Sequence, residues 1–529
     1  MRLSKILLAS AAMVLVSAVA AYADTPKDTV VMAKQIDDII SLDPGEAFEF
    51  SGGEANGNMY ERLVYYDVKN VSKMYGALAE SYSVAADGKT YTFKLRPGIM
   101  FSSGNVMTSA DVVYSIPRAV IMNKTPGFIL TQFGFTKDNV AARVRATDGM
   151  TVVLETETKF APSFFYYCLT AGVSSIVDSA TVKQHEENGD FGNGWLKQHS
   201  AGTGAYMLRS WKANESYVMD ANPNYHGKAP LTPHVIVRHV KEVATQRLLL
   251  EKGDVDYARD LGKDELEAVG KNPDIAFDEG RKGAISYLGL NQKNANLKKP
   301  EVIEAFKYLV DYDGIQKNIL KGVRVTHQAF LPVGFLGALE DKPYKFDLAK
   351  AKELLAKAGL GGGFSVSMDV RARYPDMDIA QALQASFAQA GIKLEIIQGD
   401  GKQVITKYRA RNHEIVMLDW GPDYQDPHTN AQTFASNFDN SDGSPTKTLA
   451  WRNSWDIPEM SKKTQAAVEE PDAEKRASMY IELQREHQKV APFVIMFQQI
   501  EVAAHRKNVE GFVVGPGFDN NWYSGIKKN

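Results

Sequence analysis

The sequence predicts a mixed α/β fold divided into two or three lobes. Segments with strand patterns and segments with helix patterns alternate along the chain, and no short repeat recurs, which argues against solenoids and propellers. The 529 residues exceed what one hydrophobic core usually serves. A composition of 44% hydrophobic and 24% charged residues is that of a folded globular protein, so disordered, collagen-like and coiled-coil classes are excluded.

The first 23 residues have the pattern of a cleavable secretory signal. Arg2 and Lys5 form a short positive region, residues 6–21 are apolar apart from two serines, and the small-residue pattern Ala21-Tyr22-Ala23 ends the stretch. The apolar run is shorter than the ~20 residues that a membrane-spanning helix needs. We therefore expect cleavage before Asp24 and a mature chain that is secreted and carries no anchor.

Charge and cysteine content exclude several kinds of partner and site. The 61 Lys+Arg nearly balance the 64 Asp+Glu, which offers no strongly basic face for a nucleic acid. The single cysteine, Cys168, forbids an intramolecular disulfide and a multi-cysteine metal or iron–sulfur site. It follows four aromatic residues, a setting that favours an inert buried thiol over a nucleophile.

A β-hairpin is predicted over residues 81–95. Tyr91, Phe93 and Leu95 alternate with polar residues, as they do in a half-buried strand, and Asp87-Gly88 supplies the tight turn before them.

Four helices are predicted further along the chain, each with a residue that begins or ends it. They span residues 300–309 (opened by Pro300), 348–358 (ended by Gly359), 379–390 (ended by Gly391) and 472–490 (stopped before Pro492). A glycine cluster at 359–363 separates the second helix from a strand at 364–370. The cluster lacks the Lys-Ser/Thr ending of a nucleotide-binding loop, so a plain linker is expected there.

A longer pattern resembles a family signature. It comprises Leu78-Ala79-Glu80-Ser81, Asp87 to Gly98, Phe101, Gly104, Thr108 and Ala110-Asp111-Val112. Shorter matches follow at Asn58 to Leu63, Gly202 to Tyr206, Asn222 to Gly227, Gly253 to Asp256, Leu288 to Gln292, Asp347 to Gly359 and Val509 to Gly511. On these residues the chain resembles the large periplasmic solute-binding proteins of the peptide, opine and nickel class, which serve bacterial ABC importers. One departure is Ala205, where the family usually has proline.

The resemblance implies a bilobed periplasmic-binding-protein fold with an extra N-terminal subdomain and two hinge-crossing strands. Lobe I is expected at residues 24–285 plus 498–529, with the extra subdomain at about 60–195, and lobe II at 286–497. The crossings are expected near Ser286 and Phe497. Such a cleft can enclose a small ligand and report its presence by hinge closure.

The resemblance also implies an anchor for the ligand. Trp420-Gly421-Pro422-Asp423 resembles the Trp-x-x-Asp motif of dipeptide- and oligopeptide-binding proteins, whose aspartate pairs with the α-amino group of the ligand. Asp423 is the first candidate, with Trp420 as a flat wall beside the ligand and Tyr424 as its neighbour. The alternative interpretation is that Trp420 belongs to the core and Asp423 caps a turn.

Two arginines are candidates for the opposite end of the ligand. Arg371 and Arg373 follow the predicted strand at 364–370, in the region where dipeptide-binding relatives place an arginine that grips the ligand carboxylate. The planar guanidinium suits that role because it matches a carboxylate bidentately. The resemblance does not say which arginine corresponds, and a solvated basic loop is the alternative for either.

The first lobe is expected to contribute a second wall. Phe48, Glu49, Phe50 and Ser51 resemble the stretch that lines the cleft from lobe I, where aromatic rings would give broad apolar contacts. Both phenylalanines are equally compatible with an ordinary core. Tyr408, Arg409 and Arg411 form a charged run at helical spacing, which predicts a solvated face.

Patterns for catalysis or metal binding are weak. Ser444 to Lys447 and Ser524 to Lys527 have the spacing of serine acyltransferases, but neither is expected on a helix. Asp423, Asp426 and His428 are the alternative metal ligands, although the ligand-binding resemblance already accounts for this loop. We expect no catalytic activity, no cofactor and no metal.

The sequence therefore predicts a monomeric periplasmic protein that binds a small solute, foremost a short peptide, and delivers it to the membrane permease of an ABC importer, with no nucleic-acid partner. Two alternatives stay open. One is a non-peptide solute (opine, metal chelate or oligosaccharide), in its anionic form held by Arg371 and Arg373 with Asp423 structural. The other is a secreted hydrolase or transferase.

Overall fold

One large mixed sheet organises the computed structural model, which describes residues 25–444 and 446–529. The predicted signal at 1–23 and Asp24 lie outside the described residues. The sheet has eleven strands in the order β15-β14-β16-β12-β17-β11-β1-β10-β9-β8, with β13 paired to β17. They are β1 (Thr29–Lys34), β8 (Tyr206–Lys212), β9 (Ser216–Ala221), β10 (His234–His239), β11 (Tyr257–Ala258), β12 (Ile275–Leu290), β13 (Arg324–Thr326), β14 (Phe364–Arg371), β15 (Ile392–Gly399), β16 (Ile415–Trp420) and β17 (Phe493–Arg506). The mixed α/β class is as predicted.

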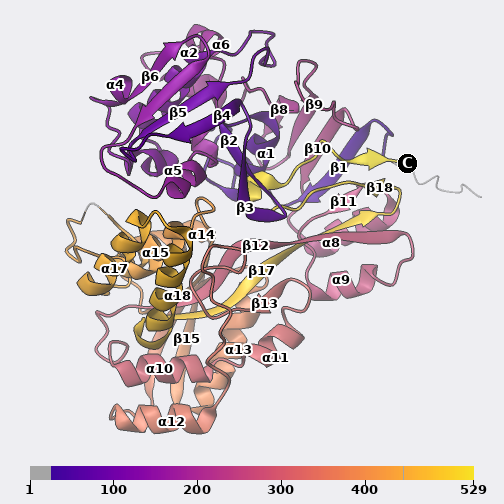
Figure 1. The fold of residues 1–529 in the computed structure, drawn as a ribbon. Helices are drawn as coiled ribbons and strands as arrows, with labels where there is room; N and C mark the ends of the chain where they lie inside the picture. Colours follow the sequence, from indigo (N-terminus) through magenta and orange to yellow (C-terminus); the bar gives the residue numbers. More distant parts are fainter. Residues whose placement is uncertain (1–24, 445) are drawn as a thin grey trace, which may run out of the picture.

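Two long strands join the two ends of this sheet. β12 and β17 pair antiparallel, and Figure 1 shows both running from the side of α8 and α9 into the lower part of the molecule. Their pairing is interrupted between Arg281 and Ile285 and resumes with Ile285 opposite Gln498; the next pair is Ser286 opposite Phe497, the two positions predicted as hinge crossings. Every position of β12 from Lys282 onward is buried, as expected for a strand covered on both faces. The lobe boundaries themselves stay a prediction.

The upper part of the molecule holds a separate four-stranded sheet in the order β4-β5-β7-β6 (Figure 1). Its strands are β4 (Ala79–Val84), β5 (Thr90–Leu95), β6 (Val144–Asp148) and β7 (Thr151–Glu155). The predicted hairpin is confirmed, because β4 pairs with β5 antiparallel and Tyr91, Phe93 and Leu95 are buried. Gly88 in its turn has a φ of 68°, which favours glycine. The helices α2 (Ser109–Met122), α3 (Phe128–Thr131), α4 (Val140–Arg143) and α5 (Pro162–Cys168) accompany this sheet.

The remaining elements of the first half and of the C-terminus complete the part of the molecule above and beside β12 and β17 (Figure 1). They are α1 (Phe50–Met59), β2 (Val64–Asp67), β3 (Asn70–Gly76), η1 (Thr125–Gly127), η2 (Gly172–Ser174), α6 (Ser179–Gln184), α7 (Asn193–Leu196), α8 (Val243–Lys252), α9 (Lys263–Val269), β18 (Val509–Glu510), η3 (Phe518–Asn520) and β19 (Lys527–Lys528).

The helices of the lower part are α10 (Pro300–Leu309), α11 (Tyr312–Asn318), α12 (Leu348–Lys357), α13 (Asp376–Gln389), α14 (Gly401–Arg409), α15 (His428–Ala435), α16 (Leu449–Arg452), α17 (Pro458–Glu469) and α18 (Ala473–Val490). The four predicted helices are confirmed, although α13 begins three residues earlier than predicted. The glycine cluster is a linker between α12 and β14, as predicted. Among residues 25–444 and 446–529, no helix combines the length and apolarity needed to cross a membrane.

Candidate ligand-binding site

The predicted anchor lies where β16 leaves the sheet. Trp420 is the last residue of β16 and pairs with Ile285 of β12, next to the interruption between β12 and β17. The chain then passes through Gly421, Pro422 and Asp423 before α15 begins. The anchor segment, residues 420–424, therefore stands beside the two long strands that join the two ends of the sheet.

Asp423 is a carboxylate without an ion-pair partner in the part of the chain that the structure describes. Its backbone N–H donates to Oγ1 of Thr429 at 3.1 Å. Burial raises the pKa of the Asp423 carboxyl to about 7, and the opposing effects of Arg452 and of the Thr429 hydroxyl are too small to offset it. An incoming ammonium group would supply the missing positive charge.

Buried polar atoms without a hydrogen-bond partner are concentrated around this segment. Within residues 420–430 the described structure leaves five such atoms unpaired: Nε1 of Trp420, Oη of Tyr424, Oε1 of Gln425, Nδ1 of His428 and Oδ1 of Asn430. Buried polar groups in native proteins are normally paired. A run of orphaned groups next to an unpaired carboxylate is what a polar ligand would satisfy.

The turn-capping role considered for Asp423 belongs to another residue. Asp426 accepts the His428 backbone N–H at 2.9 Å and forms a two-pronged ion pair with Arg476, at 2.6 and 2.7 Å. Asp426 is therefore occupied in holding the loop. Residues 25–444 and 446–529 contain no group of three or more His, Cys, Asp or Glu side chains placed to hold a metal ion.

The anchor segment also touches the upper part of the molecule. The Tyr424 ring lies 5.8 Å from the ring of Phe164 in α5, and His428 lies 5.1 Å from the same ring. Arg476 of α18 donates to Oγ of Ser163 at 3.3 Å. Tyr424 is buried among these contacts, and Trp420 is half-buried with its ring edge-on to Phe434.

The two candidate arginines differ in their ion-pair partners. Arg373 donates to Asp376 at 2.7 Å and to Asp419 at 3.0 Å. Arg371 forms no ion pair among the described residues. Burial and the neighbouring Arg373 charge lower the pKa of Arg371 more than the carboxylates of Asp376, Asp419 and Asp37 raise it. Its guanidinium packs on Gly401, the first residue of α14, where the helix N-terminus adds partial positive charge. Arg371 is thus the arginine free to receive an anionic group.

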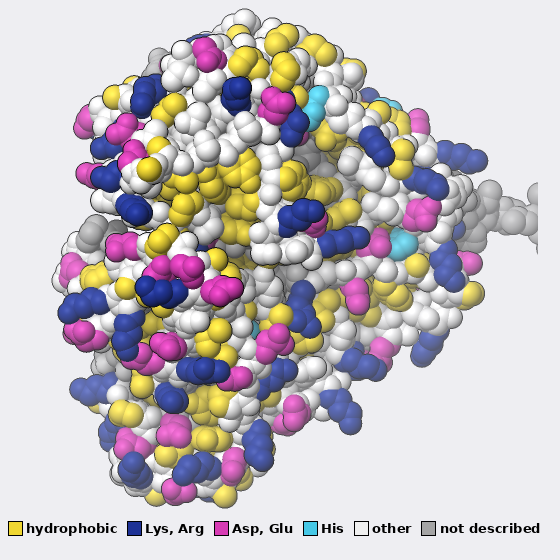
Figure 2. Space-filling view, viewed as in Figure 1, with side chains coloured by type: hydrophobic (Ala, Val, Ile, Leu, Met, Phe, Trp, Pro, Cys, Tyr) yellow, Lys and Arg dark blue, Asp and Glu magenta, His cyan; other side chains and the backbone are white. Residues whose placement is uncertain are grey.

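Phe48, Glu49, Phe50 and Ser51 lead into α1 and have different surroundings. Phe48 is half-buried and packs edge-on to Phe128, whereas Phe50 is 44% exposed and stacks on Phe518 with ring centroids 3.8 Å apart. Burial raises the pKa of Glu49. Ser51 is buried, with its N–H donating to Asp38 at 3.1 Å. Figure 2 shows hydrophobic side chains gathered along the boundary between the upper and lower parts of the molecule.

A separate groove of about 600 Å³ between α13 and β15 contains none of the predicted site residues. Its lining residues have no orphaned buried polar atom among those described, in contrast to the anchor segment. We therefore place the candidate site by its unpaired polar groups and not by open volume.

The structure also tests the predictions for the charged run at Tyr408 to Arg411, for the two Ser/Lys pairs and for Cys168. The prediction of a solvated face at Tyr408, Arg409 and Arg411 is wrong for two of the three residues. Tyr408 and Arg411 are buried, because residues from further along the chain cover the end of α14: Arg411 bonds to Asn440 and Ser454, and the Tyr408 hydroxyl accepts from Asn453. The Ser444 to Lys447 and Ser524 to Lys527 pairs lie outside helices, and the pKa of Cys168 is raised by burial.

Sequence reasoning missed three residues that act on the site. Thr429 and Arg452 influence Asp423, and Phe518 backs Phe50. Phe518 is 468 positions from Phe50 in a chain without a pattern connecting the two, so only the folded structure reveals their contact.

Comparison with known proteins agrees with this geometry. The model of "Bacterial extracellular solute-binding proteins, family 5 Middle" matches residues 73–442, more than half of the chain. The chain belongs to this family. The probable D,D-dipeptide-binding periplasmic protein DdpA of Escherichia coli K12 is 29% identical over 507 residues, which cover 94% of this chain and 93% of that relative. The glutathione-binding protein GsiB of Pectobacterium atrosepticum is 24% identical over 491 residues, 90% of each chain.

The fold is also that of solved relatives. The periplasmic binding protein DppA of Helicobacter pylori, associated with an ABC transporter and solved with the peptide STSA, superimposes with a TM-score of 0.81 and 25% identity. The match covers 94% of this family 5 protein and 98% of the Helicobacter protein. The periplasmic-binding-protein fold predicted from the sequence is confirmed.

Proposed function

We propose that this family 5 protein captures a short peptide by its free amino end and delivers it to the permease of an ABC importer. The observation that carries the proposal is the Asp423 carboxylate, which has no ion-pair partner among the described residues and lies in a run of orphaned polar groups. An α-ammonium group would pair with it through a charge-assisted hydrogen bond. Relatives named as dipeptide- and glutathione-binding proteins support a peptide as the ligand.

In this proposal Arg371 receives the carboxylate end of the peptide. Its guanidinium forms no ion pair with the described side chains, while Arg373 is already shared by Asp376 and Asp419. Trp420 supplies an aromatic wall and an indole N–H without an acceptor in residues 25–444 and 446–529. Phe50, and with it the stretch Phe48 to Ser51, forms the wall opposite.

The proposal also covers the lobe boundaries, the location of the protein in the cell and the absence of catalysis. Lobe I comprises residues 24–285 and 498–529, lobe II comprises 286–497, and the protein is a periplasmic monomer released by cleavage after Ala23. The ligand stabilises the closed form because only a ligand with higher affinity for that form can shift the equilibrium. The protein binds its solute unchanged and catalyses no reaction.

A thermal-shift panel on the mature protein tests this function. We expect di- and tripeptides with free amino groups to raise the melting temperature and acetylated versions to have no effect. A ligand at about a hundredfold over its Kd stabilises the folded state by about 2.7 kcal/mol. Equal shifts from free and acetylated peptides would contradict the role of Asp423, and cleavage of the peptide during incubation would favour a hydrolase.

A second candidate function is the transport of a non-peptide anionic solute. It is favoured by Arg371, whose unpaired guanidinium lies over the N-terminus of α14. Opine-like acids and metal chelates without a free α-amino group belong in the same panel. A shift from these compounds and none from peptides would replace the peptide proposal with this one.

A further inference from the structure

Gly421, in the anchor segment, lies directly against an aromatic ring of lobe I. A Cβ atom placed on Gly421 would lie 3.2 Å from both Cε1 and Cζ of Phe50 and 3.8 Å from Cε2 of Phe518. These distances are at or below van der Waals contact, so the ring edge rests on the glycine backbone. The contact joins the loop that carries Asp423 to α1 of the other lobe.

Phe50 is held from behind and has little room to retreat. Its ring stacks on Phe518 with a centroid separation of 3.8 Å and an interplanar angle of 17°, and the ammonium of Lys282 lies 5.0 Å from the Phe518 centroid. The backbones of α1 and η3 are also in close contact, since a Cβ on Gly57 would lie 2.1 Å from the Asp519 carbonyl oxygen. The Phe50–Phe518 stack is therefore a firm surface and not a flexible side chain.

The neighbouring residue makes a second close contact. A Cβ on Gly283 of β12 would lie 2.7 Å from Cγ of Pro422. Gly283 is in the interruption between Arg281 and Ile285, where β12 leaves its pairing with β17. The anchor segment thus rests on the crossover strand through Pro422 and on lobe I through Gly421.

We propose that the Gly421–Phe50 contact is the stop that sets how far the two lobes close, and thereby where Asp423 stands relative to lobe I. This positioning role rests on the proposed function of a hinged binding protein. A side chain at position 421 would meet the ring before the lobes reach the described arrangement. The apparent affinity then falls with the population of the closed form.

Four variants and one control test the proposal. Gly421→Ala and Gly421→Val add increasing bulk, Phe50→Ala removes the ring, and the double variant Gly421→Val/Phe50→Ala removes the clash while keeping the added side chain. Gly421 does not have a positive φ, so the substitutions act through bulk and not through backbone strain. Gly362→Val is the matched control, because Gly362 lies in the linker after α12, also lacks a positive φ, and has no atom within 4 Å of an added Cβ.

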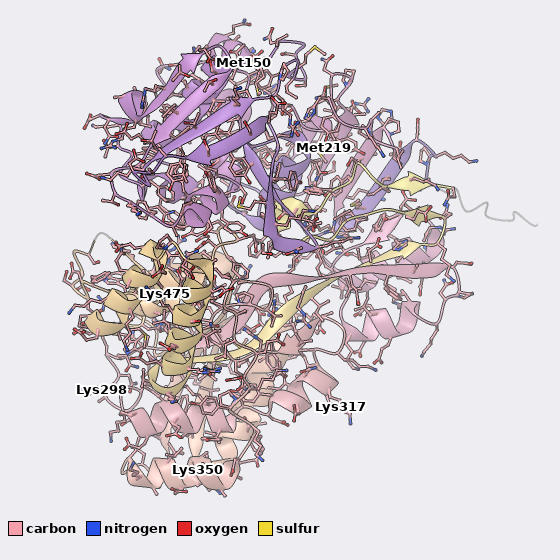
Figure 3. All side chains as sticks on the ribbon, in the orientation of Figure 1. Met150, Met219, Lys298, Lys317, Lys350 and Lys475 are labelled. Atoms are coloured by element: carbon pink, nitrogen blue, oxygen red, sulfur yellow. The ribbon has the colours of Figure 1, made fainter. Side chains whose placement is uncertain are left out.

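The first readout is the distance between the ends of the molecule. Spin labels at Gly149→Cys and Lys350→Cys report on it, since Figure 3 places Met150, the neighbour of Gly149, at the top of the molecule and Lys350 at the bottom; Cys168 is buried and stays unlabelled. We expect Gly421→Val to remove the shortest distances seen in the otherwise unchanged protein, and the double variant to restore them. Unchanged distances in Gly421→Val, or no restoration in the double variant, would overturn the proposal.

The second readout is affinity for whichever compound of the thermal-shift panel binds. We expect a loss of at least about tenfold for Gly421→Val, a smaller loss for Gly421→Ala and no change in Gly362→Val. Because Phe50 is itself part of the proposed binding wall, the double variant is compared with Phe50→Ala, and we expect the added valine to cause no further loss of affinity there. The distance measurement needs no ligand. A panel without a binding peptide would therefore count against the proposed function alone, while the distances would still decide the role of Gly421.

Discussion

Two of the regions that hold buried charges differ in how those charges are paired. A group that we call the hinge cluster, after the proposed hinge, consists of Lys34, Glu54, Arg259, Lys282 and Glu501, drawn from β1, α1, the residue after β11, β12 and β17. Arg259 lies 2.7 Å from Glu54, and Lys282 lies 3.0 Å from Glu501. Lys34 also pairs with Glu54, and Arg259 with Glu501. Each carboxylate in the cluster therefore has two cations.

The anchor segment and Arg371 show the opposite arrangement. Asp423 and Arg371 each have no ion pair among the described residues, and their pKa values shift toward the neutral form. In the hinge cluster the cations reverse the effect of burial. Burial alone would raise the pKa of Glu54, but Arg259 and Lys34 lower it to about 2. Pairing, and not burial, therefore distinguishes the charges of the hinge cluster from the two charges that we propose bind the ligand.

The largest expected effect comes from unpairing the hinge cluster. Glu501→Gln removes one carboxylate. Lys282 then loses its ion-pair partner, and Arg259 keeps only one of its two partners, Glu54. Breaking a buried pair on one side lowers the free energy of unfolding by about 3–5 kcal/mol. Urea denaturation measures this loss. The matched control is Glu510→Gln, which breaks an exposed pair with Lys527 and is expected to cost about 1 kcal/mol or less. Equal losses in both variants would contradict the distinction.

The second largest effect is expected for Asp423→Asn, which should lower the affinity for the ligand and raise the stability of the fold. Asp423→Asn keeps the shape of the side chain and removes the charge, so affinity for a free-amine peptide should fall about a hundredfold or more. Isothermal calorimetry measures the loss. Asp456→Asn, an exposed position, is the control and should bind normally.

The same variant has a predicted stability signature. The raised pKa of Asp423 means that the unfolded chain ionises first, so folding stability is lost as the pH rises from about 4 to about 7. Asp423→Asn removes this loss. Its melting temperature should exceed that of the parent protein more at pH 8 than at pH 5. A variant that melts lower at pH 8 would show that Asp423 is paired within the fold.

The third effect tests the choice between the two arginines. Arg371→Gln should weaken binding of peptides with a free carboxylate about 10- to 100-fold, as expected for loss of a charged hydrogen bond. Arg373→Gln should affect mainly stability, because Arg373 is bound to Asp376 and Asp419. Binding titrations with peptides and their C-terminal amides separate the outcomes. A larger loss of affinity in Arg373→Gln than in Arg371→Gln would reverse the assignment.

These arginines also show how far sequence reasoning reaches. The hairpin at residues 81–95 and the helix at 300–309 follow from local patterns, and Asp423 follows from a motif within four residues. The proposed choice between Arg371 and Arg373 does not follow from a local pattern, because both residues lie on one short segment. It depends on Asp376 and Asp419, and Asp419 reaches Arg373 only through the pairing of β14 with β16.

The hinge cluster could not be predicted from local sequence patterns for the same reason. Its members stretch from Lys34 to Glu501, and each is an ordinary charged residue in its own segment. The prediction for Tyr408 and Arg411 was wrong for a related reason: helical spacing says which residues share a face, but not whether residues further along the chain, such as Asn440 and Asn453, will cover it. Long-range topology decides which charges become paired, and topology is what a single sequence specifies least directly.

The smallest effect is a pH dependence that belongs to the anchor segment alone. With a pKa of about 7, the Asp423 carboxyl is mostly ionised at pH 8 and mostly protonated at pH 6. Because a neutral carboxyl cannot pair with an ammonium group, affinity for a free-amine peptide should fall about fivefold between pH 7 and pH 6, where the α-amino group of the peptide, with a pKa of about 7.7–8.0, stays mostly protonated. Calorimetry across this range measures the slope. In Asp423→Asn the residual affinity should be flat, since no group with this pKa remains at the anchor. A slope that persists in the variant would place the titrating group elsewhere, and a flat profile in the parent protein would mean that Asp423 is ionised throughout and already compensated before the ligand arrives.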